Sequence, residues 1–313
     1  MKLVSLEDIN CPLGCKKNDE VVLTGQDLLY DLPGKYTVVK CQSCGLIRTN
    51  PRPTPETMGF YYPDDYGPYV GTQVKANASN KKSWLKNVFQ LFANSNTTRL
   101  PNLPVGRMLE LGCASGSFLN EMANKGWQVE GIEFSELAAR EAGKIGYNVY
   151  AGSLETAPTP EKKFDLVVGW MVVEHLHEPV LGLKKLVEWT NPRGHLVFSV
   201  PNAGSREFKI FKDKWYALHL PNHLYFYTPE SIKKVLKASG WRLVKIHHQR
   251  VLGNLVASLG YELRGKGFKR LGNKLIKFPE NAGKWNYFLY PLAWFLSLFG
   301  QTGRMTVWAE RDL

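Results

Sequence analysis

Cysteine is scarce in this sequence and unevenly distributed. Only five cysteines occur in 313 residues, and four of them form two tight pairs, Cys11 with Cys15 and Cys41 with Cys44. The opening residues, MKLVSLEDIN, lack the apolar run behind a basic flank that marks a secretory signal. We therefore expect a protein of the reducing cytoplasm, where paired cysteines indicate a metal site rather than disulfides.

A membrane-spanning run is missing as well. Residues 285–299 read WNYFLYPLAWFLSLF, but this run is shorter than the roughly 20 apolar residues needed to cross a bilayer, and Pro291 interrupts it. The preceding stretch, 264–284, holds seven Lys or Arg residues against one acid. This combination fits an interfacial element at the inner face of the membrane, resting on anionic lipid or on a lipid-linked substrate. A helical hairpin packed on a sheet, or a dimer contact, fits equally well.

Acidic residues are outnumbered by basic ones. The 40 Lys and Arg residues against 28 Asp and Glu residues give a formal net charge of +12. Such a charge favours anionic partners, among them nucleic acid, anionic lipid and phosphorylated metabolites, although a solvated basic surface explains it equally well. A hydrophobic content of 44% is enough for a proper interior in a chain of this length.

Short apolar runs alternate with helical patterns from Val105 onward, which indicates a mostly parallel sheet in an α/β fold. Strands are predicted at 107–111, 128–133, 147–152, 164–170, 195–200, 241–248 and 304–311. The predicted organisation is a cysteine module at 1–50, a linker and lid at 51–104, a core at 105–250, a basic and apolar helical insertion at 251–303, and a last core strand at 304–313. Within the module, 21–30 and 36–40 read as the two strands of a hairpin.

The first turn of the predicted core has the composition of a nucleotide-binding loop. ELGCASG, starting at Glu110, lies between a strand and a helix, where glycines let a ligand approach the backbone. Glu133 ends the next strand, where a carboxylate can bind ribose hydroxyls. A dinucleotide fingerprint would place glycines at Ala114 and Ser117. Glu110 would repel a pyrophosphate but suits a cationic methionine group.

These features resemble class I S-adenosylmethionine (SAM)-dependent methyltransferases. ELGCASGSF, GIEFS, GSLE, FDLVVGWMVVEHLHEP and NPRGHLVFSVPN are similar to their successive motifs, in the branch that includes ubiquinone-biosynthesis enzymes. One departure is Ala114, where the family has glycine. The resemblance covers 105–250 and the last strand, and it implies a Rossmann-like sheet whose last strand is antiparallel.

The same resemblance implies a set of SAM-binding residues. The methionine part would lie against the loop, ribose against Glu133, and adenine beside the turn at Ser153, while Cys113 reads as a small packing residue of the loop. The positions carried over are Glu110, Gly112, Cys113, Ala114, Gly116, Glu133, Phe134, Ser153, Leu154, Trp170 and Met171.

The four clustered cysteines match the spacing of two zinc knuckles, C-x3-C and C-x2-C. Four thiolates at Cys11, Cys15, Cys41 and Cys44 close a tetrahedral site, which indicates a structural Zn²⁺ ion. Reduced, metal-free cysteines are the alternative. The module resembles N-terminal segments of bacterial methyltransferases of sugar and natural-product pathways. The tyrosines that follow it form either a lid over the cofactor or plain packing between module and core: Tyr61, Tyr62, Tyr66 and Tyr69.

Histidines follow the fourth and fifth predicted strands, at the edge where ligands of open α/β sheets bind. Glu174 and His175 come after the fourth strand, and His219 and His223 after the fifth. A neutral histidine can act as general base toward a hydroxyl acceptor, and we expect His175, His223 and Glu174 to be the catalytic group. Fixing loop structure by hydrogen bonds is the alternative role.

The resemblance leaves the acceptor open. An aromatic loop at 215–227 and the apolar insertion favour oxygen methylation of a small molecule, a sugar or a lipid-linked glycan. An RNA methyltransferase is the alternative, because some such enzymes carry a zinc module and the net charge is positive. Nucleic acid is nevertheless the disfavoured partner, since the NPPY-type signature and recognisable RNA-binding motifs are absent. A non-catalytic SAM-binding protein is a distant third hypothesis. The oligomeric state cannot be deduced.

Overall fold

A computed structural model describes residues 4–62, 99–283 and 285–312. Its centre is a seven-stranded sheet with the order β12-β13-β10-β9-β6-β7-β8. Neighbouring strands from β8 to β10 run parallel, and β13 is antiparallel to both of its neighbours. The strands are β6 (Arg107–Leu111), β7 (Gln128–Glu133), β8 (Asn148–Ala151), β9 (Phe164–Trp170), β10 (Thr190–Pro201), β12 (Trp241–His248) and β13 (Arg304–Arg311). The predicted Rossmann-like sheet with an antiparallel last strand is confirmed.

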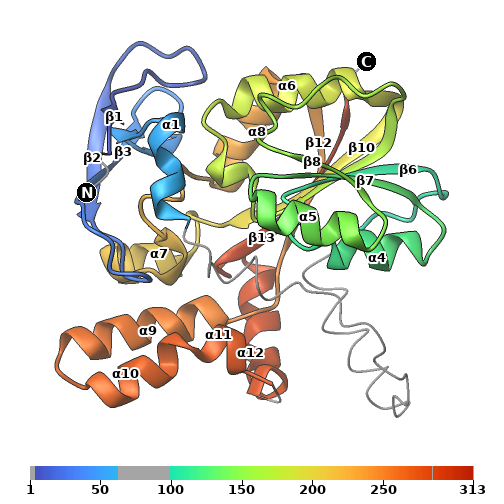
Figure 1. Cartoon of the computed structure of the whole chain (residues 1–313). Helices are drawn as coiled ribbons and strands as arrows, with labels where there is room; N and C mark the ends of the chain where they lie inside the picture. The colour runs from blue at the N-terminus through green and yellow to red at the C-terminus, as the bar shows by residue number, and fades with distance from the viewer. Residues whose placement is uncertain (1–3, 63–98, 284, 313) are drawn as a thin grey trace.

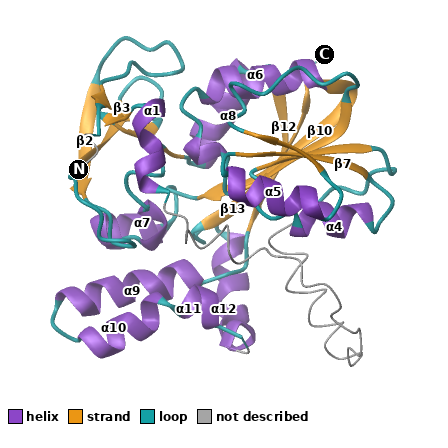
Figure 2. Ribbon diagram, viewed as in Figure 1, coloured by secondary structure: helices purple, strands orange, loops and turns teal. Residues whose placement is uncertain are grey.

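Helices cover both faces of this sheet. α4 and α5 lie on one face, and α6 and α8 lie on the other (Figures 1 and 2). These helices are α4 (Ser117–Ala123), α5 (Glu136–Lys144), α6 (Pro179–Trp189) and α8 (Pro229–Ala238). Their starts follow local chemistry, since the Ser135 side chain caps α5, and Thr228 and Ser231 form a reciprocal capping box on α8. Short helices after β9 and β10 lead to the edge where the strands end: η2 (Val173–His175), α7 (Arg206–Phe211), η3 (Lys212–Lys214) and η4 (Tyr216–Leu218).

The N-terminal module forms two small sheets. β2 and β3 pair as the predicted hairpin, but the first strand ends at Gly25 because the Asp27 carboxylate accepts hydrogen bonds from three following backbone N–H groups and turns the chain. The described elements before the first core strand are β1 (Leu6–Glu7), β2 (Asp19–Gly25), β3 (Tyr36–Cys41), β4 (Ile47–Thr49), β5 (Arg52–Pro53), α1 (Pro55–Met58) and η1 (Gly59–Tyr61). The start of the predicted linker is therefore regular structure, whereas Tyr66 and Tyr69 lie outside the described residues.

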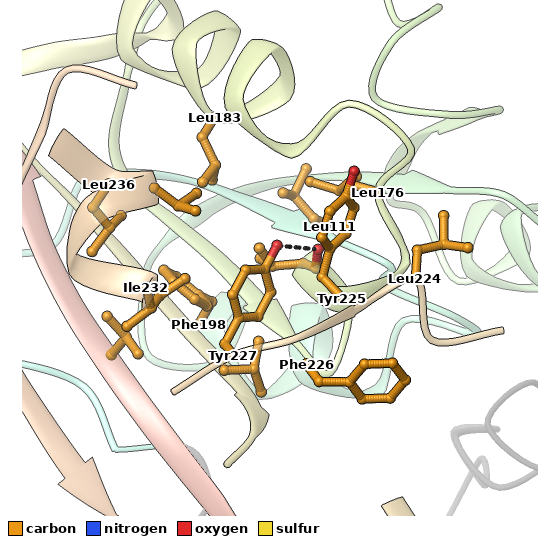
Figure 3. Close-up of a cluster of buried hydrophobic side chains, with 14 of the residues drawn as sticks. Leu111, Leu176, Leu183, Phe198, Leu224, Tyr225, Phe226, Tyr227, Ile232 and Leu236 are labelled. Atoms are coloured by element: carbon orange, nitrogen blue, oxygen red, sulfur yellow. Dashed lines mark hydrogen bonds between the residues drawn. The ribbon is translucent and has the colours of Figure 1, made fainter. Parts of the chain in front are cut away.

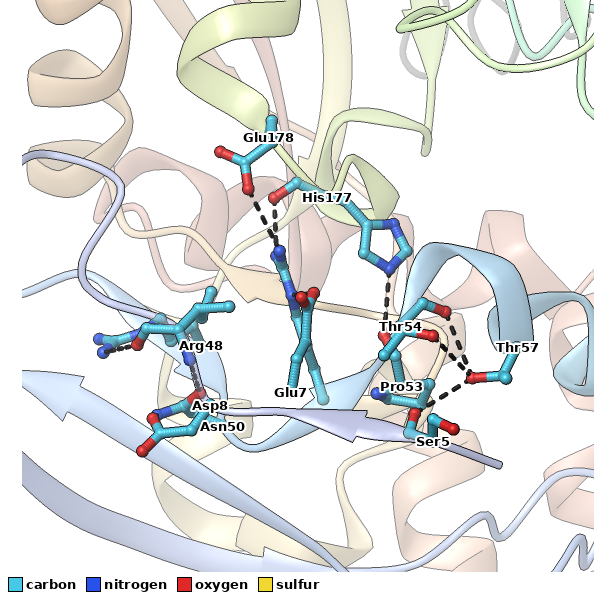
Figure 4. Close-up of polar contacts among 12 residues, drawn as sticks. Ser5, Glu7, Asp8, Arg48, Asn50, Pro53, Thr54, Thr57, His177 and Glu178 are labelled. Atoms are coloured by element: carbon cyan, nitrogen blue, oxygen red, sulfur yellow. Dashed lines mark hydrogen bonds and ion pairs between the residues drawn. The ribbon is translucent and has the colours of Figure 1, made fainter. Parts of the chain in front are cut away.

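The module and the core share secondary structure. β11 (Tyr225–Phe226), from the loop after β10, pairs with β4 and completes the module's sheet in the order β11-β4-β3-β2. The fully buried Arg52 adds a polar joint: it donates hydrogen bonds to the Glu7 carboxylate (2.7 Å), the His177 carbonyl (2.6 Å) and the Tyr225 hydroxyl (3.0 Å). The Glu178 carboxylate lies 3.3 Å from the same guanidinium, and Figure 4 shows Glu7, His177 and Glu178 near one another. The cysteine module is thus joined to the α/β core by a shared sheet and by buried hydrogen bonds.

One hydrophobic core runs through both parts. Leu111 and Phe198 from the large sheet, and Tyr225 and Tyr227 from the loop after it, belong to the same buried cluster (Figure 3). The Tyr227 hydroxyl donates to the Val173 carbonyl (3.4 Å), which satisfies its polar end. The segment directly after His223 is therefore anchored in the core by packed aromatic rings.

The insertion before the last strand is helical, as predicted. Its helices form a lobe below the sheet, on the side away from α6 and α8 (Figure 1). They are α9 (Gly253–Gly265), α10 (Lys269–Ile276), α11 (Phe278–Asn281) and α12 (Trp285–Leu298). No helix in the described part of the chain is both long and apolar enough to span a bilayer.

Candidate active site

The loop between β6 and α4 bends sharply at glycine. Gly112 has φ of +64° and Gly116 has φ of +82°, values that glycine adopts readily. A Cβ at Gly112 would lie 2.5 Å from the Val172 side chain, so the residue after Met171 leaves no room for a side chain at this position. The backbone N–H of Ala114 donates to the Glu133 carboxylate (2.8 Å), which joins the loop to the end of β7.

A cavity of about 1410 Å³ opens at this edge of the sheet. Eight of the eleven positions predicted to bind the cofactor line it: Gly112, Ala114, Glu133, Phe134, Ser153, Leu154, Trp170 and Met171. The cavity continues past them to His175, His219 and His223. Residues from four separate strand ends and from the module therefore share one space.

Three predicted cofactor contacts do not line this cavity. Cys113 is buried with its sulfur close to Gly131, which agrees with a packing role. Gly116 precedes the first turn of α4. Glu110 is 3% exposed, and one of its carboxylate oxygens has no hydrogen-bond partner. Burial, together with the nearby Glu133 charge, raises the pKa of Glu110 well above its ordinary value.

Glu174, His175 and His223 come together as predicted. Glu174 Oε1 lies 4.0 Å from His223 Nε2, and the two imidazole rings are 4.7 Å apart, edge to face. Both histidines line the cavity, whereas Glu174 is completely buried and does not. Neither Glu174 carboxylate oxygen has a hydrogen-bond partner. This buried carboxylate depends on its neighbours for compensation.

Hydrogen bonds orient both imidazoles. The His223 Nδ1 lies 2.9 Å from the Ala217 carbonyl, and because a carbonyl only accepts, Nδ1 carries the proton and Nε2 keeps a lone pair. His175 Nδ1 likewise donates to the Asn222 carbonyl (2.9 Å), with the Tyr62 hydroxyl 2.8 Å from the same nitrogen. Each ring thus keeps its lone pair at Nε2, and that of His223 lies 4.0 Å from Glu174 Oε1.

Burial sets the charge states of this cluster. It lowers the pKa of His175 to about 3 and holds the pKa of His223 well below its ordinary value, with His175 and His219 adding to the shift. It raises the pKa of Glu174 to about 8, and the Arg304 cation opposes that rise. Both imidazoles are therefore neutral at physiological pH, and each keeps one unprotonated ring nitrogen.

The four clustered cysteines converge as the spacing predicts. Their sulfur atoms lie within 4.8 Å of one another, and Cys11 and Cys44 are 3.5 Å apart. Gly14 and Gly45 turn the two knuckles through left-handed φ values and donate backbone hydrogen bonds to Cys11 and Cys41. Zinc–sulfur bonds of about 2.3 Å in a tetrahedron require sulfur separations slightly under 4 Å, so this arrangement fits a zinc ion.

The methyltransferase domain profile matches residues 84–246, just over half of the chain. The chain belongs to the methyltransferase domain family. The predicted class of SAM-dependent methyltransferases is thereby confirmed, together with SAM as the cofactor of the family.

Individual relatives match parts of this methyltransferase. The ubiquinone biosynthesis O-methyltransferase of Alkalilimnicola ehrlichii is 27% identical over 110 residues, or 33% of this chain and 44% of that protein. The enzyme of the same name from Aromatoleum aromaticum is 33% identical over 34% of this chain and 47% of that protein. The chain spans about half the length of these curated relatives. A SAM-dependent methyltransferase of known structure from Mesorhizobium loti aligns with a TM-score of 0.44 and 16% identity, over 68% of this chain and 94% of the other.

Arg304 and His219 line the methyltransferase cavity, but the sequence interpretation did not select them as site residues. Arg304 is half-buried, lines the cavity, and donates to the Asn254 side chain (3.0 Å). It adds a cation near Glu174 and near Glu207, and burial raises the pKa of Glu207 to about 7. His219 was noted on the loop but not chosen, although it too lines the cavity. A cation directly before the apolar run MTVWA was the available signal for Arg304.

Proposed function

We propose that this methyltransferase transfers a methyl group from SAM to a hydroxyl oxygen of a small-molecule acceptor, such as a sugar or a lipid-linked glycan. The observation that carries the proposal is that a single cavity connects the glycine loop with the neutral His175 and His223 imidazoles. A pocket for one drug-sized ligand has about 300–1,000 Å³. A cavity of about 1410 Å³ leaves room for a cofactor and an acceptor together.

The loop side of the cavity suits the cofactor. The Gly112 backbone, the Glu133 carboxylate and the turn at Ser153 would hold SAM, whose sulfonium supplies an electrophilic methyl group. Trp170 and Met171 line the same cavity at the end of β9. These positions would orient the two reactants and exclude water, which is most of what an in-line displacement requires.

The histidine side suits a hydroxyl acceptor. His223 Nε2 would take the hydroxyl proton while Nδ1–H remains bonded to Ala217, so the ring does not need to turn. Glu174, 4.0 Å from the same nitrogen, would stabilise the imidazolium that forms. Because burial raises the pKa of Glu174 to about 8, the ionised form required for this role becomes more populated as the pH rises toward 8.

A product assay tests the proposal. The protein is incubated with SAM and, separately, with pools of free sugars, nucleotide sugars, polyprenyl-linked saccharides and ribosomal RNA, and S-adenosylhomocysteine and methylated products are identified by mass spectrometry and NMR. A methoxy group on a small or lipid-linked acceptor supports the proposal. Methylated RNA, or transfer to nitrogen or carbon, would contradict it.

His223→Ala tests the assigned proton acceptor. Loss of a general base predicts a fall in turnover of at least ~100-fold, with the SAM dissociation constant changed less than ~3-fold because His223 is not among the positions assigned to SAM. His195→Ala is the matched control, since His195 pairs with Glu310 on the sheet (3.4 Å) and does not line the cavity. Equal losses of turnover and SAM affinity would assign His223 a structural role instead.

We also propose that Cys11, Cys15, Cys41 and Cys44 hold one structural Zn²⁺ ion. Four thiolates leave no open coordination position, so the ion would stabilise the module and take no part in methyl transfer. Glu174, His175 and His223 also bring three potential ligand atoms together. Metal analysis separates the two groups: one zinc per chain is expected, and a second divalent ion that His223→Ala removes would overturn the proton-acceptor role.

A further inference from the structure

The last helix of the insertion exposes an apolar surface that the described residues of the chain leave uncovered. α12 has 14 residues, and Ala293 is its one buried side chain. Phe288 is 76% exposed and Trp285 64%. The other large apolar residues that are exposed on or just after this helix are Tyr287, Leu292, Trp294, Phe295, Leu298 and Phe299. A helix that is apolar around its whole circumference is normally buried in a larger assembly or in lipid.

Helix α10 of the same lobe, with the residues that flank it, carries exposed positive charge. Five cations between 266 and 277 are exposed, and Phe268 and Leu271 are exposed among them. The cations are Lys266, Lys269, Arg270, Lys274 and Lys277. Lys266 pairs with Glu262 on the preceding turn. A surface that combines basic side chains with exposed aromatic ones complements the negatively charged headgroups and apolar interior of an anionic bilayer.

The lobe holds these two features in a defined arrangement. α9 and α10 cross closely at Gly260 and Gly272, where a Cβ on either glycine would lie within 3 Å of the other helix's backbone. Arg250, at the end of the last strand before the lobe, donates to the Tyr290 hydroxyl of α12 (2.8 Å). α10 and α12 both belong to the lobe below the sheet (Figure 1), so its basic and its aromatic groups lie on the same part of the molecule.

We propose that the α9–α12 lobe docks on an anionic lipid surface. The aromatic residues of α12 lie in the interface and the cations of α10 contact the headgroups. At 1.5 Å per residue, 14 helical residues extend about 21 Å, short of the ~30 Å hydrocarbon core, so α12 rests in the surface and does not cross it.

A second copy of the chain is a poorer occupant of this surface. A two-fold dimer places the same patch on both sides of the interface. Such an interface would bring two sets of the five cations toward one another without added acids to balance them. Lipid headgroups supply the missing negative charge.

The lobe also forms part of the active-site wall. Glu280 of α11 and Tyr216 line the cavity. α9 holds Tyr216 in place, because the Tyr216 backbone N–H donates to the Ser258 hydroxyl (2.8 Å) and the Tyr216 ring stacks on Tyr261. An acceptor anchored in the bound membrane would therefore reach the cavity past α11. This second step rests on the proposed function, whereas docking does not.

Vesicle co-sedimentation tests the docking. The full chain is mixed with phosphatidylcholine vesicles with and without phosphatidylglycerol, at low and high salt. Binding at least ~10-fold stronger to the anionic vesicles, and weakened by salt, is expected. The paired changes Phe288→Ser with Phe299→Ser, and Lys269→Glu with Arg270→Glu, should each reduce that binding ~10-fold or more.

Two controls keep the outcomes distinct. Leu181→Ser alters an equally exposed apolar side chain on α6 and should leave vesicle binding unchanged. SAM affinity, measured calorimetrically on every variant, should also be unchanged, because none of these residues lines the cavity. Absence of vesicle binding with normal SAM affinity would overturn docking and leave the proposed function intact. A dimer that the α12 changes convert to a monomer, without loss of lipid binding, would also overturn docking.

Discussion

Three residues other than glycine hold left-handed backbone conformations around the cavity. Ala114, Met171 and His219 have φ values of 46°, 59° and 41°, and all three line the cavity. Such conformations cost ~1 kcal/mol or more for a residue with a Cβ, and they persist where the surrounding structure determines them. They come from three different connections, so the strain gathers where cofactor and acceptor would meet.

Gly112→Val should reduce SAM affinity at least ~100-fold. Valine disfavours φ of +64°, and its Cβ would lie 2.5 Å from the Val172 side chain, so the loop must move away from the cofactor position. Some thermal stability should be lost as well, because the collision is internal. Calorimetric titration measures the affinity, and Gly143→Val on α5, where a Cβ meets no neighbour, is the control. Unchanged SAM affinity in Gly112→Val would show that the cofactor binds elsewhere.

Glu174→Gln should change how stability depends on pH. Burial raises the pKa of Glu174 from 4.5 to about 8, so protonated Glu174 favours the folded state. That contribution is complete below about pH 4.5 and is lost as the pH rises through 8. The neutral glutamine has no such loss. The free energy of unfolding of the variant should therefore rise relative to that of the wild type by about 1.4 kcal/mol for each pH unit within this window. Urea unfolding at pH 5, 6 and 7 measures the difference, and a constant difference would contradict the assigned pKa.

At the scale of elements, the cysteine module depends on pairing with a distant segment. β4 lies between β3 and β11, and the Thr49 side chain donates to the His223 carbonyl (2.9 Å). Loosening of the module should therefore reach the loop that carries His223. The proposed structural ion would thus influence the active site without contacting the substrate.

Removal of one zinc ligand should destabilise the whole chain. Cys44→Ala should lose the zinc ion and lower the melting temperature by at least about 10 °C, since metal binding supplies folding free energy in a small module. Cys113→Ala, which alters the buried cysteine outside the cluster, should keep one zinc per chain. Elemental analysis and thermal unfolding measure both variants. A wild type that contains no zinc and melts at the same temperature as Cys44→Ala would contradict the proposed zinc site.

At the scale of the whole molecule, local patterns predicted the core well. The strands at 107–111, 128–133, 164–170, 241–248 and 304–311 have the predicted bounds, because short apolar runs between glycine, proline and polar turns are local signals. The approach of Glu174, His175 and His223 was also predictable, since β9 and β10 are adjacent parallel strands whose carboxyl ends share one edge.

Long-range features were out of reach of the sequence. Two-residue β11 carries no strand signal of its own and forms only because β4 offers a free edge. Arg52 falls in the predicted linker at 51–104, yet it is buried at the joint between module and core. Glu110 reads as a cofactor contact, but whether its side chain faces the cavity depends on packing behind the loop.

Calorimetric titration of the purified chain with SAM, and separately with NADH, tests the central claim most directly. The account predicts saturable binding of one SAM per chain and no heat with NADH, because the loop joins glycine turns to an acidic strand end and lacks a dinucleotide fingerprint. Preference for NADH, or failure to bind SAM in a folded sample, would contradict the assignment of this cavity to methyl transfer.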